Sequence, residues 1–576
     1  MKKLLLGGPG SGKTTHLVNA TVQAKSNQQK CLFLSYNVRN VLSAQQRAGL
    51  SQKDCRSIYA FTLAIYRDIA IARHMPVREL IDEGVCRFLA RKAIVEAKKH
   101  IFLNNVRANM RMAQELVELT ERYIHKTNEI PVDTDTIIAN AKAYGLNDRY
   151  GYELYKVLPT YMETVRREGA ILFCEMLCIV VQTHKRYPTF IERITSEVSL
   201  VMVDEIQDLT FLEFELIKGI IKSVSSDIIL AGDFNQCVTQ YRGANPNQLI
   251  ESITELGFEV EQLTSSYRFG SHIGHFASVY QQHSHSVCCQ SDRYTRLNIL
   301  HEGVNLKETS HGNSKALLTR TKEQSLVYQF WLESKGMNVI VNDGYYWKES
   351  QVFQALLGWA VMVTDFDVDQ LPYLKAKSMI RTLLYYPYRS ANDEVINVLT
   401  NEDPKTAFNG LTAASELGAS SLGGLPYFLL KAKSQLQPNC TFHEFLSVIM
   451  NNQHFHVEVN ARRKSYSPLA HLHTLMEGSD VKLTDFISLM AALTLNPNAQ
   501  QVEVMTLHSS KGLEFDDVIL AGLHKSCIPL PTDTIEEAES LFYVGMTRAK
   551  HNLTLIVPKQ GCTPLIQKMI KVGKIA

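Results

Sequence analysis

A glycine-rich segment near the N-terminus constrains the fold of this chain more than any other feature. It reads GGPGSGKTT over residues 7–15, follows an apolar run at 4–6 and precedes a segment able to form a helix. In the order strand, glycine loop, helix, the backbone N–H groups of the loop and the helix N-terminus face phosphate oxygens. Lys13 adds a positive charge and Thr14 a hydroxyl that can ligate Mg²⁺. The predicted phosphate site comprises Gly8, Pro9, Gly10, Ser11, Gly12, Lys13, Thr14 and Thr15.

A second apolar segment ends in two adjacent carboxylates. Residues 198–208 read VSLVMVDEIQD, so Asp204 and Glu205 come at the carboxyl end of a predicted buried strand. Ligands of open parallel sheets bind at that end. Asp204 is placed to hold Mg²⁺, and Glu205 to orient and deprotonate an attacking water. An acidic pair at a strand end is often plain solvated surface, so this interpretation depends on the glycine segment.

The bulk properties set the class of protein. A chain of 576 residues exceeds what one hydrophobic core usually supports, so three or four domains are expected. With 45% hydrophobic and 20% charged residues, and without an apolar run of about 20 residues, a membrane protein is not expected. The eleven cysteines lack a repeating framework, which suits free thiols in the cytoplasm. A net charge of +2 requires that any nucleic acid bind through a local groove.

Four further segments carry short motifs in a fixed order. They read LAGDFNQCVTQYRGAN at 230–245, LTSSYR at 263–268, VMTLHSSKGLEF at 504–515 and EAESLFYVGMTRAK at 537–550. Together with the first two segments, they resemble the motifs of the UvrD/PcrA/Rep family of superfamily 1 (SF1A) DNA helicases. The resemblance spans most of the chain. It implies an ATP-driven motor that moves 3′ to 5′ along single-stranded DNA and unwinds 3′-tailed duplexes, with Mg²⁺ as cofactor and ATP as substrate.

The resemblance also implies the remaining nucleotide contacts. Gln236 would sense the γ-phosphate, Tyr267 would stack on the base, and Arg268 would reach the γ-phosphate. Glu514 would lie toward the nucleotide sugar, and Arg548 would be the arginine finger. Positive charges stabilise the transition state of phosphoryl transfer. If both arginines lie on a different lobe from the glycine segment, hydrolysis requires domain closure.

A third group of residues is expected to contact DNA. By the same resemblance these are Tyr36, Asn37, Phe61, Tyr241, Arg242, Thr506 and His508. Tyr241 would stack on a base without regard to sequence, although an ordinary core position stays open for it. Two segments depart from the family: LSYN at 34–37 stands where TFTN is usual, and AFT at 60–62 replaces Thr-Phe-His. Both departures put the grip of the first lobe on DNA in doubt.

The positions of the motifs predict an α/β fold with two RecA-like parallel-sheet motor domains, each with an inserted, mainly helical subdomain. The first motor domain takes residues 1–84 and 191–262, with its insertion at 85–190; the second takes 263–345 and 500–576, with its insertion at 346–499. Strands are expected in the first sheet at 30–36, 199–203 and 228–231, beside the glycine segment. In the second sheet they are expected at 316–319, 339–341, 502–506, 518–521 and 553–557.

Several alternatives stay open at this stage. Seven basic residues at helical spacing in the first insertion could follow DNA phosphates or simply face solvent; they are Arg87, Arg91, Lys92, Lys98, Lys99, Arg107 and Arg111. A zinc site at His283, His285, Cys288 and Cys289 is disfavoured, because the spacing fits no standard structural site.

The function also has two rivals. The chain could be an ATP-gated DNA-binding or loading module that works with a nuclease, replication or defence factor on the second insertion. A small-molecule phosphotransferase is nearly excluded by the last two motifs. Base selectivity is expected to be poor, because no glutamine precedes the glycine segment and Thr15 stands where the family usually has an arginine.

Overall fold

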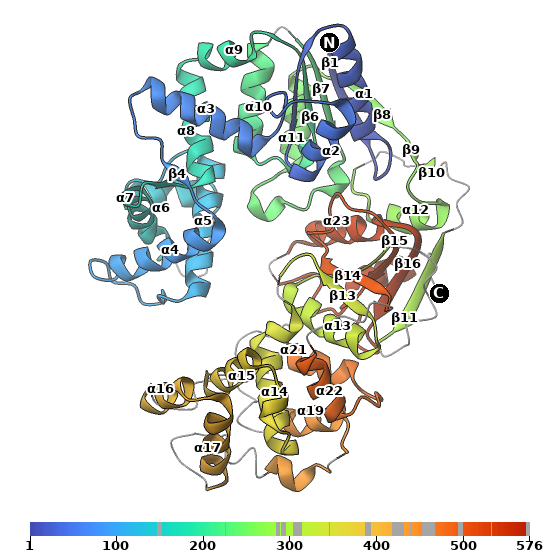
Figure 1. The fold of residues 1–576 in the computed structure, drawn as a ribbon. Helices are drawn as coiled ribbons and strands as arrows, with labels where there is room; N and C mark the ends of the chain where they lie inside the picture. Colours follow the sequence, from blue (N-terminus) through green and yellow to red (C-terminus); the bar gives the residue numbers. More distant parts are fainter. Residues whose placement is uncertain are drawn as a thin grey trace. The chain divides into compact units, whose positions relative to one another are not determined.

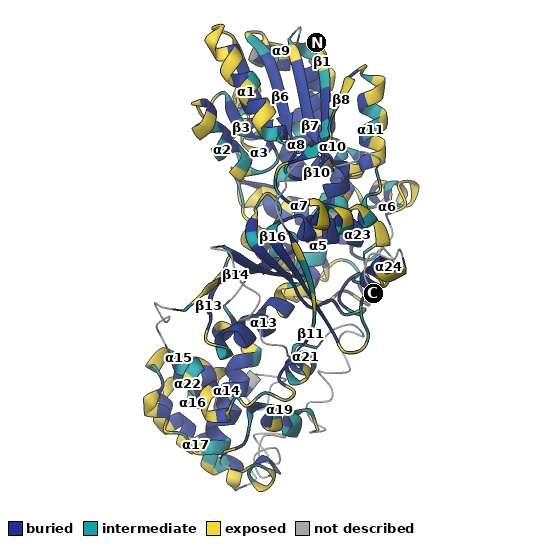
Figure 2. Cartoon of the chain, turned by 90° about the vertical axis from the view of Figure 1, so that its right-hand side faces the viewer, coloured by how far each residue is buried: buried dark blue, intermediate teal, exposed yellow. Residues whose placement is uncertain are grey.

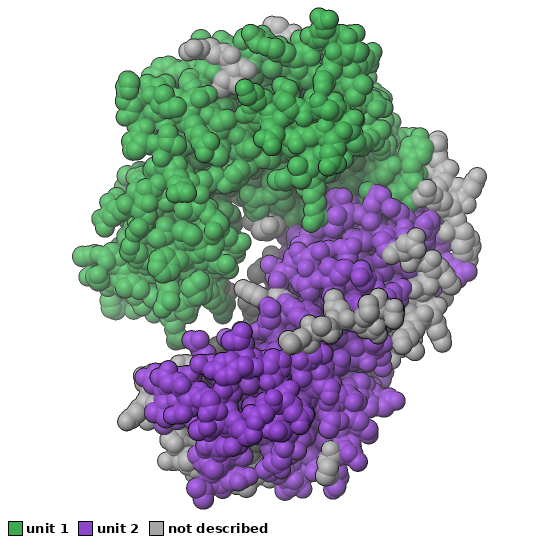
Figure 3. All heavy atoms as spheres, viewed as in Figure 1, with its two compact units in different colours: residues 1–268, 282–290 green, residues 269–281, 291–576 purple. Residues whose placement is uncertain are grey.

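The computed structural model forms two compact units. Unit 1 holds Met1–Arg268 and Gln282–Gln290, and unit 2 holds Phe269–Gln281 and Ser291–Ala576 (Figure 3). The structure describes residues 1–571 except 147–151, 225, 284–287, 290–294, 303–313, 345, 386–392, 418–430, 438, 452–466, 493–498 and 532.

Unit 1 is organised around a six-stranded sheet in which every strand pair is parallel. The strand order is β3 (Cys55–Ser57), β2 (Lys30–Ser35), β6 (Val198–Asp204), β7 (Asp227–Gly232), β1 (Lys2–Gly7) and β8 (Glu259–Leu263) (Figure 1). The predicted strands at 30–36, 199–203 and 228–231 are confirmed. Because all strands run the same way, their carboxyl ends share one edge of the sheet.

The two faces of this sheet pack against different helices. Successive residues of a strand point to opposite faces, so Leu5 joins the core under α1 (Lys13–Ser26) and α2 (Val38–Ala48). Leu4 joins the larger core on the other side, beneath α3, α8 and α10. Those helices span Ile58–Ala72, Phe173–Arg186 and Phe211–Ser223. Figure 2 shows the central strands β6, β7 and β1 as largely buried.

The first insertion is mainly helical, as the sequence predicts. Its helices are α4 (Glu83–Ala97), α5 (Met110–Thr127), α6 (Thr134–Ala143) and α7 (Leu158–Arg167). Helix α5 begins after Asn109, whose side chain accepts a hydrogen bond from the Met112 N–H. Its buried residues recur every three or four positions, so one face of the helix is apolar. That face packs into the same core that contains Leu4 of the sheet.

Unit 2 contains a second six-stranded sheet, again parallel throughout. Its order is β11 (Arg296–His301), β16 (Ala549–Val557), β15 (Phe515–Leu520), β12 (Lys315–Thr319), β14 (Gln501–Thr506) and β13 (Asn338–Val341). All five predicted strands of this sheet are confirmed. Within the two six-stranded sheets, the strands that the sequence did not predict are β3, β8 and β11, and each lies at the edge of its sheet.

The second insertion packs against helices next to this sheet and shares with the sheet one apolar core, which includes Leu317 and Val504. The described helices are α14 (Gln351–Thr364), α15 (Tyr373–Tyr385), α16 (Asp393–Asn401), α17 (Pro404–Glu416), α19 (Phe442–Met450), α21 (Pro468–Leu475) and α22 (Leu483–Ala491). Helix α13 (Lys322–Ser334) contacts strands of the sheet as well as α21. The two RecA-like parallel-sheet domains with helical insertions are therefore as predicted.

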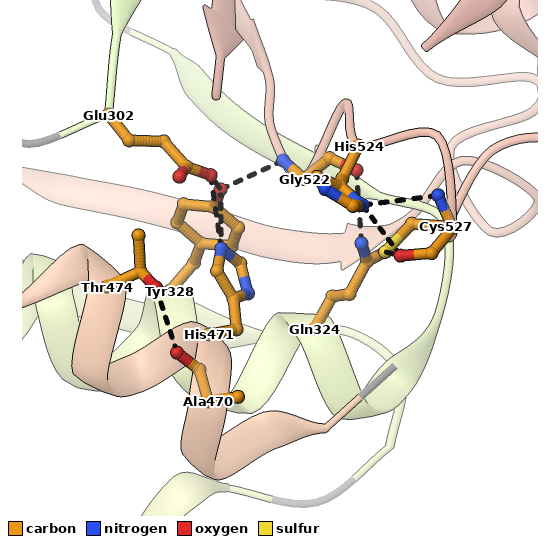
Figure 4. A network of polar contacts seen from close by, with 10 residues as sticks. Glu302, Gln324, Tyr328, Ala470, His471, Thr474, Gly522, His524 and Cys527 are labelled. Atoms are coloured by element: carbon orange, nitrogen blue, oxygen red, sulfur yellow. Dashed lines mark hydrogen bonds and ion pairs between the residues drawn. The ribbon is translucent and has the colours of Figure 1, made fainter. Parts of the chain in front are cut away.

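A buried polar network ties the second insertion to the motor sheet (Figure 4). The Tyr328 hydroxyl on α13 donates to Glu302 Oε1 over 3.0 Å and accepts the Gly522 N–H over 2.9 Å. His471 Nε2 on α21 lies 3.1 Å from the same Glu302 oxygen. Since Glu302 follows β11 and Gly522 follows β15, this network connects a helix of the insertion with two strands of the sheet.

Three general findings complete the fold. No helix among the described residues is long and apolar enough to cross a membrane. The described part of the chain also has no cluster of three or more His, Cys, Asp or Glu side chains able to hold a metal ion. The side chains of His285, Cys288 and Cys289 lie outside the described residues, so the disfavoured zinc site is not tested.

Candidate functional site

The candidate nucleotide site lies at the carboxyl edge of the unit 1 sheet. The glycine loop follows β1, Asp204 ends β6, and Asp233 follows β7. These three strands are neighbours in the order β6, β7, β1. Segments separated by about 190 residues thus meet at one edge, as the Thr14 to Asp204 hydrogen bond shows directly.

The glycine loop has the geometry of a phosphate cradle. Gly10 and Gly12 have φ angles of 73° and 86°, in the left-handed region that side chains rarely adopt. The Lys13 ammonium donates to the Gly7 and Gly8 carbonyl oxygens over 2.6 and 3.1 Å. The buried Ser11 hydroxyl has no hydrogen-bond partner among the described residues. An ammonium resting on loop carbonyls and an unsatisfied hydroxyl both suit a phosphate ligand.

The acidic pair is fixed beside this loop. Asp204 is fully buried, and its Oδ2 accepts the Thr14 hydroxyl over 2.8 Å. Burial and the neighbouring charge of Glu205 raise the pKa of Asp204 to about 7, against the lowering effects of Thr14 and Lys13. Glu205 itself has a φ of 59° although it is not a glycine. Such strained backbones concentrate at functional sites, where they fix the direction of a side chain.

Two polar residues near this pair were not predicted from the sequence. Gln207 donates to Glu205 Oε2, and its own carbonyl oxygen accepts the Asp233 N–H over 3.0 Å. The Nδ2 of Asn40 on α2 lies 3.4 Å from Asp204 Oδ2 and 3.5 Å from Glu205 Oε1. The position of Gln207 inside VDEIQD offered a signal, whereas nothing local in the sequence pointed to Asn40.

Gln236, predicted to sense the γ-phosphate, is buried in the same network. Its Nε2 donates to Asp233 Oδ2 over 2.6 Å. Because Gln207 binds the Asp233 backbone, a continuous set of hydrogen bonds connects Glu205 with Gln236. The structure therefore connects Glu205 and Gln236, which the sequence predicted in separate motifs as the water-activating and the phosphate-sensing residue.

Tyr267 and Arg268 also lie beside the glycine loop. The Tyr267 N–H donates to the Gly10 carbonyl over 3.0 Å, while its side chain is 59% exposed. Gly10 approaches the Arg268 backbone so closely that an added Cβ would lie 2.5 Å from the Cβ of Arg268. Both residues belong to unit 1, together with the loop. Only Arg548 of the two predicted arginines lies in the other unit.

The guanidinium of Arg47 lies beside Thr15. Thr15 stands at the position where an arginine was expected, and the Arg47 side chain on α2 donates to the Thr15 hydroxyl over 2.9 Å. Both side chains are exposed. A residue from the neighbouring helix therefore brings a positive charge to the start of α1.

The residues predicted to contact DNA in unit 1 fall into two groups. Tyr36 and Asn37 follow β2; Tyr36 accepts a hydrogen bond from Arg242, whose guanidinium carbon lies 5.4 Å from the centre of the Tyr36 ring. Asn37 caps α2 by accepting the Arg39 N–H. Phe61, in contrast, is 2% exposed inside the core, so a DNA contact is not proposed for its ring. The side chain of Tyr241 lies outside the described side chains.

In unit 2, the predicted nucleotide residues lie at the amino edge of the sheet. Glu514 precedes β15, and Arg548 precedes β16, the neighbouring strand. Glu514 pairs with Lys550 over 2.9 Å. Arg548 is 2% exposed, and its guanidinium donates to the Val544 and Leu513 carbonyl oxygens over 3.0 and 3.1 Å.

The predicted DNA residues of unit 2 lie at the opposite, carboxyl edge. Thr506 ends β14 and is 7% exposed; its hydroxyl donates to Asp343 Oδ2 over 2.8 Å. His508 is half-buried, and burial together with the positive charge of Arg320 lowers its pKa to about 4, so the ring is neutral at pH 7. The two edges of this sheet thus separate the two sets of predicted ligand contacts.

The basic residues of the first insertion are mostly engaged within the protein. Lys92 pairs with Glu168 over 2.6 Å, and Lys99 with Glu96 over 2.7 Å. The Arg91 guanidinium donates to the Ala108 carbonyl over 3.3 Å. Exposed pairs of this kind are typical of a solvated face.

One parallel sheet of this chain carries a glycine loop and strand-end carboxylates, and the chain contains a second parallel sheet. These features define a P-loop NTPase with two motor-type sheets. A family model of the UvrD/REP helicase N-terminal domain matches residues 1–256, and one of the UvrD-like helicase C-terminal domain matches residues 450–560. The chain belongs to the UvrD/Rep family of helicases, which places it among the DNA helicase enzymes.

Similar proteins carry helicase names. DNA helicase II of Haemophilus influenzae is 22% identical over 626 residues, covering 96% of this chain and 81% of that protein. ATP-dependent DNA helicase PcrA of Leuconostoc citreum is 22% identical and covers 96% of this chain and 79% of that protein. ATP-dependent DNA helicase Rep of Escherichia coli is 22% identical, with 73% and 69% covered.

Proposed function

We propose that this chain is an ATP-dependent DNA helicase that translocates 3′ to 5′ along single-stranded DNA and hydrolyses ATP between its two RecA-like domains. One observation carries the proposal: the hydrogen bond from Thr14 to Asp204, which joins the glycine loop to the acidic pair at one sheet edge. The residues proposed to bind phosphate, ligate the metal and activate water would therefore act at one site.

The residues of unit 1 divide the chemistry of hydrolysis. Lys13 moves from the loop carbonyls to the phosphates, where its charge offsets theirs. Glu205 accepts a proton from water as the water oxygen attacks the γ-phosphorus and the bond to the bridging oxygen of ADP breaks. Gln236 contacts the γ-phosphate, and the hydrogen bonds of Asp233 and Gln207 connect Gln236 with Glu205.

The site also fits a magnesium ion. The Thr14 hydroxyl and the buried Asp204 carboxylate are oxygen ligands of the kind that Mg²⁺ prefers, and they already lie 2.8 Å apart. An ion bound there would neutralise charge that develops on the phosphates. A divalent cation near Asp204 also keeps that carboxylate ionised, against the burial that raises its pKa.

The remaining roles rest on the family. Tyr267 would stack on the base, Glu514 would lie toward the sugar, and Arg268 and Arg548 would stabilise the transferring phosphoryl group. Tyr36, Asn37, Tyr241, Arg242, Thr506 and His508 would form the DNA contacts. Domain closure around ATP, followed by opening on product release, would then move the protein along the strand.

Paired variants test the proposal. Lys13→Ala should weaken binding of a fluorescent ATP analogue, whereas Glu205→Gln should retain binding and stop hydrolysis. Glu251→Gln, which changes an exposed carboxylate on α11 (Pro246–Glu255), is the matched control and should keep both properties. Substantial DNA-stimulated hydrolysis by Glu205→Gln would show that another group activates the water.

Polarity and unwinding are measured with tailed duplexes. The purified protein alone should unwind a duplex with a 3′ single-stranded tail and leave a 5′-tailed duplex intact. Unwinding only of the 5′-tailed duplex would contradict the proposed polarity. ATP hydrolysis and strand binding without unwinding of either substrate would favour the loading module that works with a partner.

A further inference from the structure

Asn40 reaches the acidic pair from a helix that begins directly after Asn37, a residue proposed to contact DNA. Its Nδ2 is 3.4 Å from Asp204 Oδ2 and 3.5 Å from Glu205 Oε1. The side chain is half-buried on α2, and it comes from a different element than the two carboxylates. An amide that donates to both members of the pair can influence where each carboxylate points.

Helix α2 links this amide to the DNA-contact segment. The helix begins directly after Asn37, whose side chain caps it, and Asn40 is the third residue of its first turn. In the sheet, Ser35 of β2 pairs in register with Asp204 of β6. Tyr36 therefore leaves β2 at the level where Glu205 leaves β6. A displacement of Tyr36 or Asn37 by a bound strand moves the start of α2, and Asn40 with it.

Glu205 is held from two sides in this structure. Gln207 donates to one carboxylate oxygen, and Asn40 donates to the other. Together these two hydrogen bonds restrict the directions in which the carboxylate of Glu205 can turn. The Asn40 contact is long, so a small shift of α2 is enough to break it.

We propose that Asn40 is a positioning residue that restrains Glu205 in the DNA-free enzyme and releases it when a strand binds at Tyr36 and Asn37. This inference rests on the proposed ATPase and DNA-binding functions. It assigns the coupling between strand binding and hydrolysis to one turn of one helix. Gln207 keeps its contact in both states, because it comes from the same segment as Glu205.

Steady-state hydrolysis tests this role. Asn40→Ala and Asn40→Leu both remove the donor, and the leucine keeps a similar volume. Without DNA, each should raise kcat about three- to tenfold, the effect of losing one weak hydrogen bond. With saturating oligo(dT), kcat should stay within about twofold of the wild type, so the stimulation ratio falls. The KM for ATP and the binding of a fluorescent ATP analogue should not change, which also confirms folding.

The control is Gln46→Ala, which removes an exposed amide from the same helix and should leave the stimulation ratio unchanged. A DNA-free kcat that is unchanged or lower in both Asn40 variants would overturn the restraining role. Wild-type protein that binds and hydrolyses ATP but is not stimulated by DNA would overturn the coupling while leaving the ATPase intact. Wild-type protein without ATP hydrolysis would overturn the proposed function itself.

Discussion

Removing one hydroxyl from the buried network of unit 2 should measurably destabilise that unit. In Tyr328→Phe the ring stays, so the change deletes only the group that donates to Glu302 and accepts the Gly522 N–H. A hydrogen bond to a charged group contributes about 1.5–3 kcal/mol, and a buried unpaired N–H costs about 1–3 kcal/mol. His471 still contacts Glu302, so the two terms do not add fully. We expect a loss of about 2–4 kcal/mol in the free energy of unfolding.

Tryptophan fluorescence isolates this unit. The chain has three tryptophans, Trp331, Trp347 and Trp359, and all three are buried in unit 2. Urea titration followed by their emission should give a lower midpoint for Tyr328→Phe with an unchanged slope. The loss in free energy then follows from the slope and the shift in midpoint.

A matched control separates the network from the chemical change. Tyr373→Phe makes the same substitution at a residue of α15 that is 58% exposed, and it should alter the free energy by less than about 0.5 kcal/mol. If Tyr328→Phe also stays within that range, the network does not stabilise the unit and the reasoning is refuted. A changed slope would instead point to the unfolded state.

Three further predictions concern acid, the glycine loop and the base. Burial alone would raise the pKa of Glu302, but its hydrogen bond with His471 holds the pKa below its ordinary value. The stability that ionised Glu302 contributes is present above about pH 4.3 and is lost as the pH falls through the lowered pKa. In urea titrations, the decrease in the free energy of unfolding on acidification should therefore be smaller in Glu302→Gln than in the wild type. Gly10→Ala should weaken binding of a fluorescent ATP analogue about tenfold or more, because its φ is 73° and the new Cβ would lie 2.5 Å from that of Arg268; a Kd within twofold of the wild type would contradict this. Values of kcat/KM for ATP, GTP, CTP and UTP should differ by less than about a hundredfold, or 2.7 kcal/mol, since stacking on Tyr267, the proposed base contact, does not distinguish one base from another; a larger preference for ATP would require a residue that reads the base by hydrogen bonds.

The meeting of the glycine loop and the acidic pair at one sheet edge could be predicted from the sequence, because each of the two parts is local. The glycine loop needs particular residues at fixed spacing, and the strands beside it are continuous apolar runs, as expected for parallel strands covered on both faces. Strands β2, β6 and β7 could be located for that reason. Strands β3, β8 and β11 could not, because β8 and β11 are mostly exposed or half-buried and carry a weaker apolar pattern, and β3 has only 3 residues.

Contacts between distant segments were decided only by the tertiary structure. Asn40 and Asp204 are 164 residues apart, and nothing in the composition of α2 indicates which of its side chains faces the acidic pair. Phe61 looked like a surface residue by its motif, yet the packing of α3 against α8 places it in the core. A motif reports which chemistry a segment can perform, through residue type and spacing. Which side chains meet depends on strand order and helix packing, and these are set by burial over the whole unit.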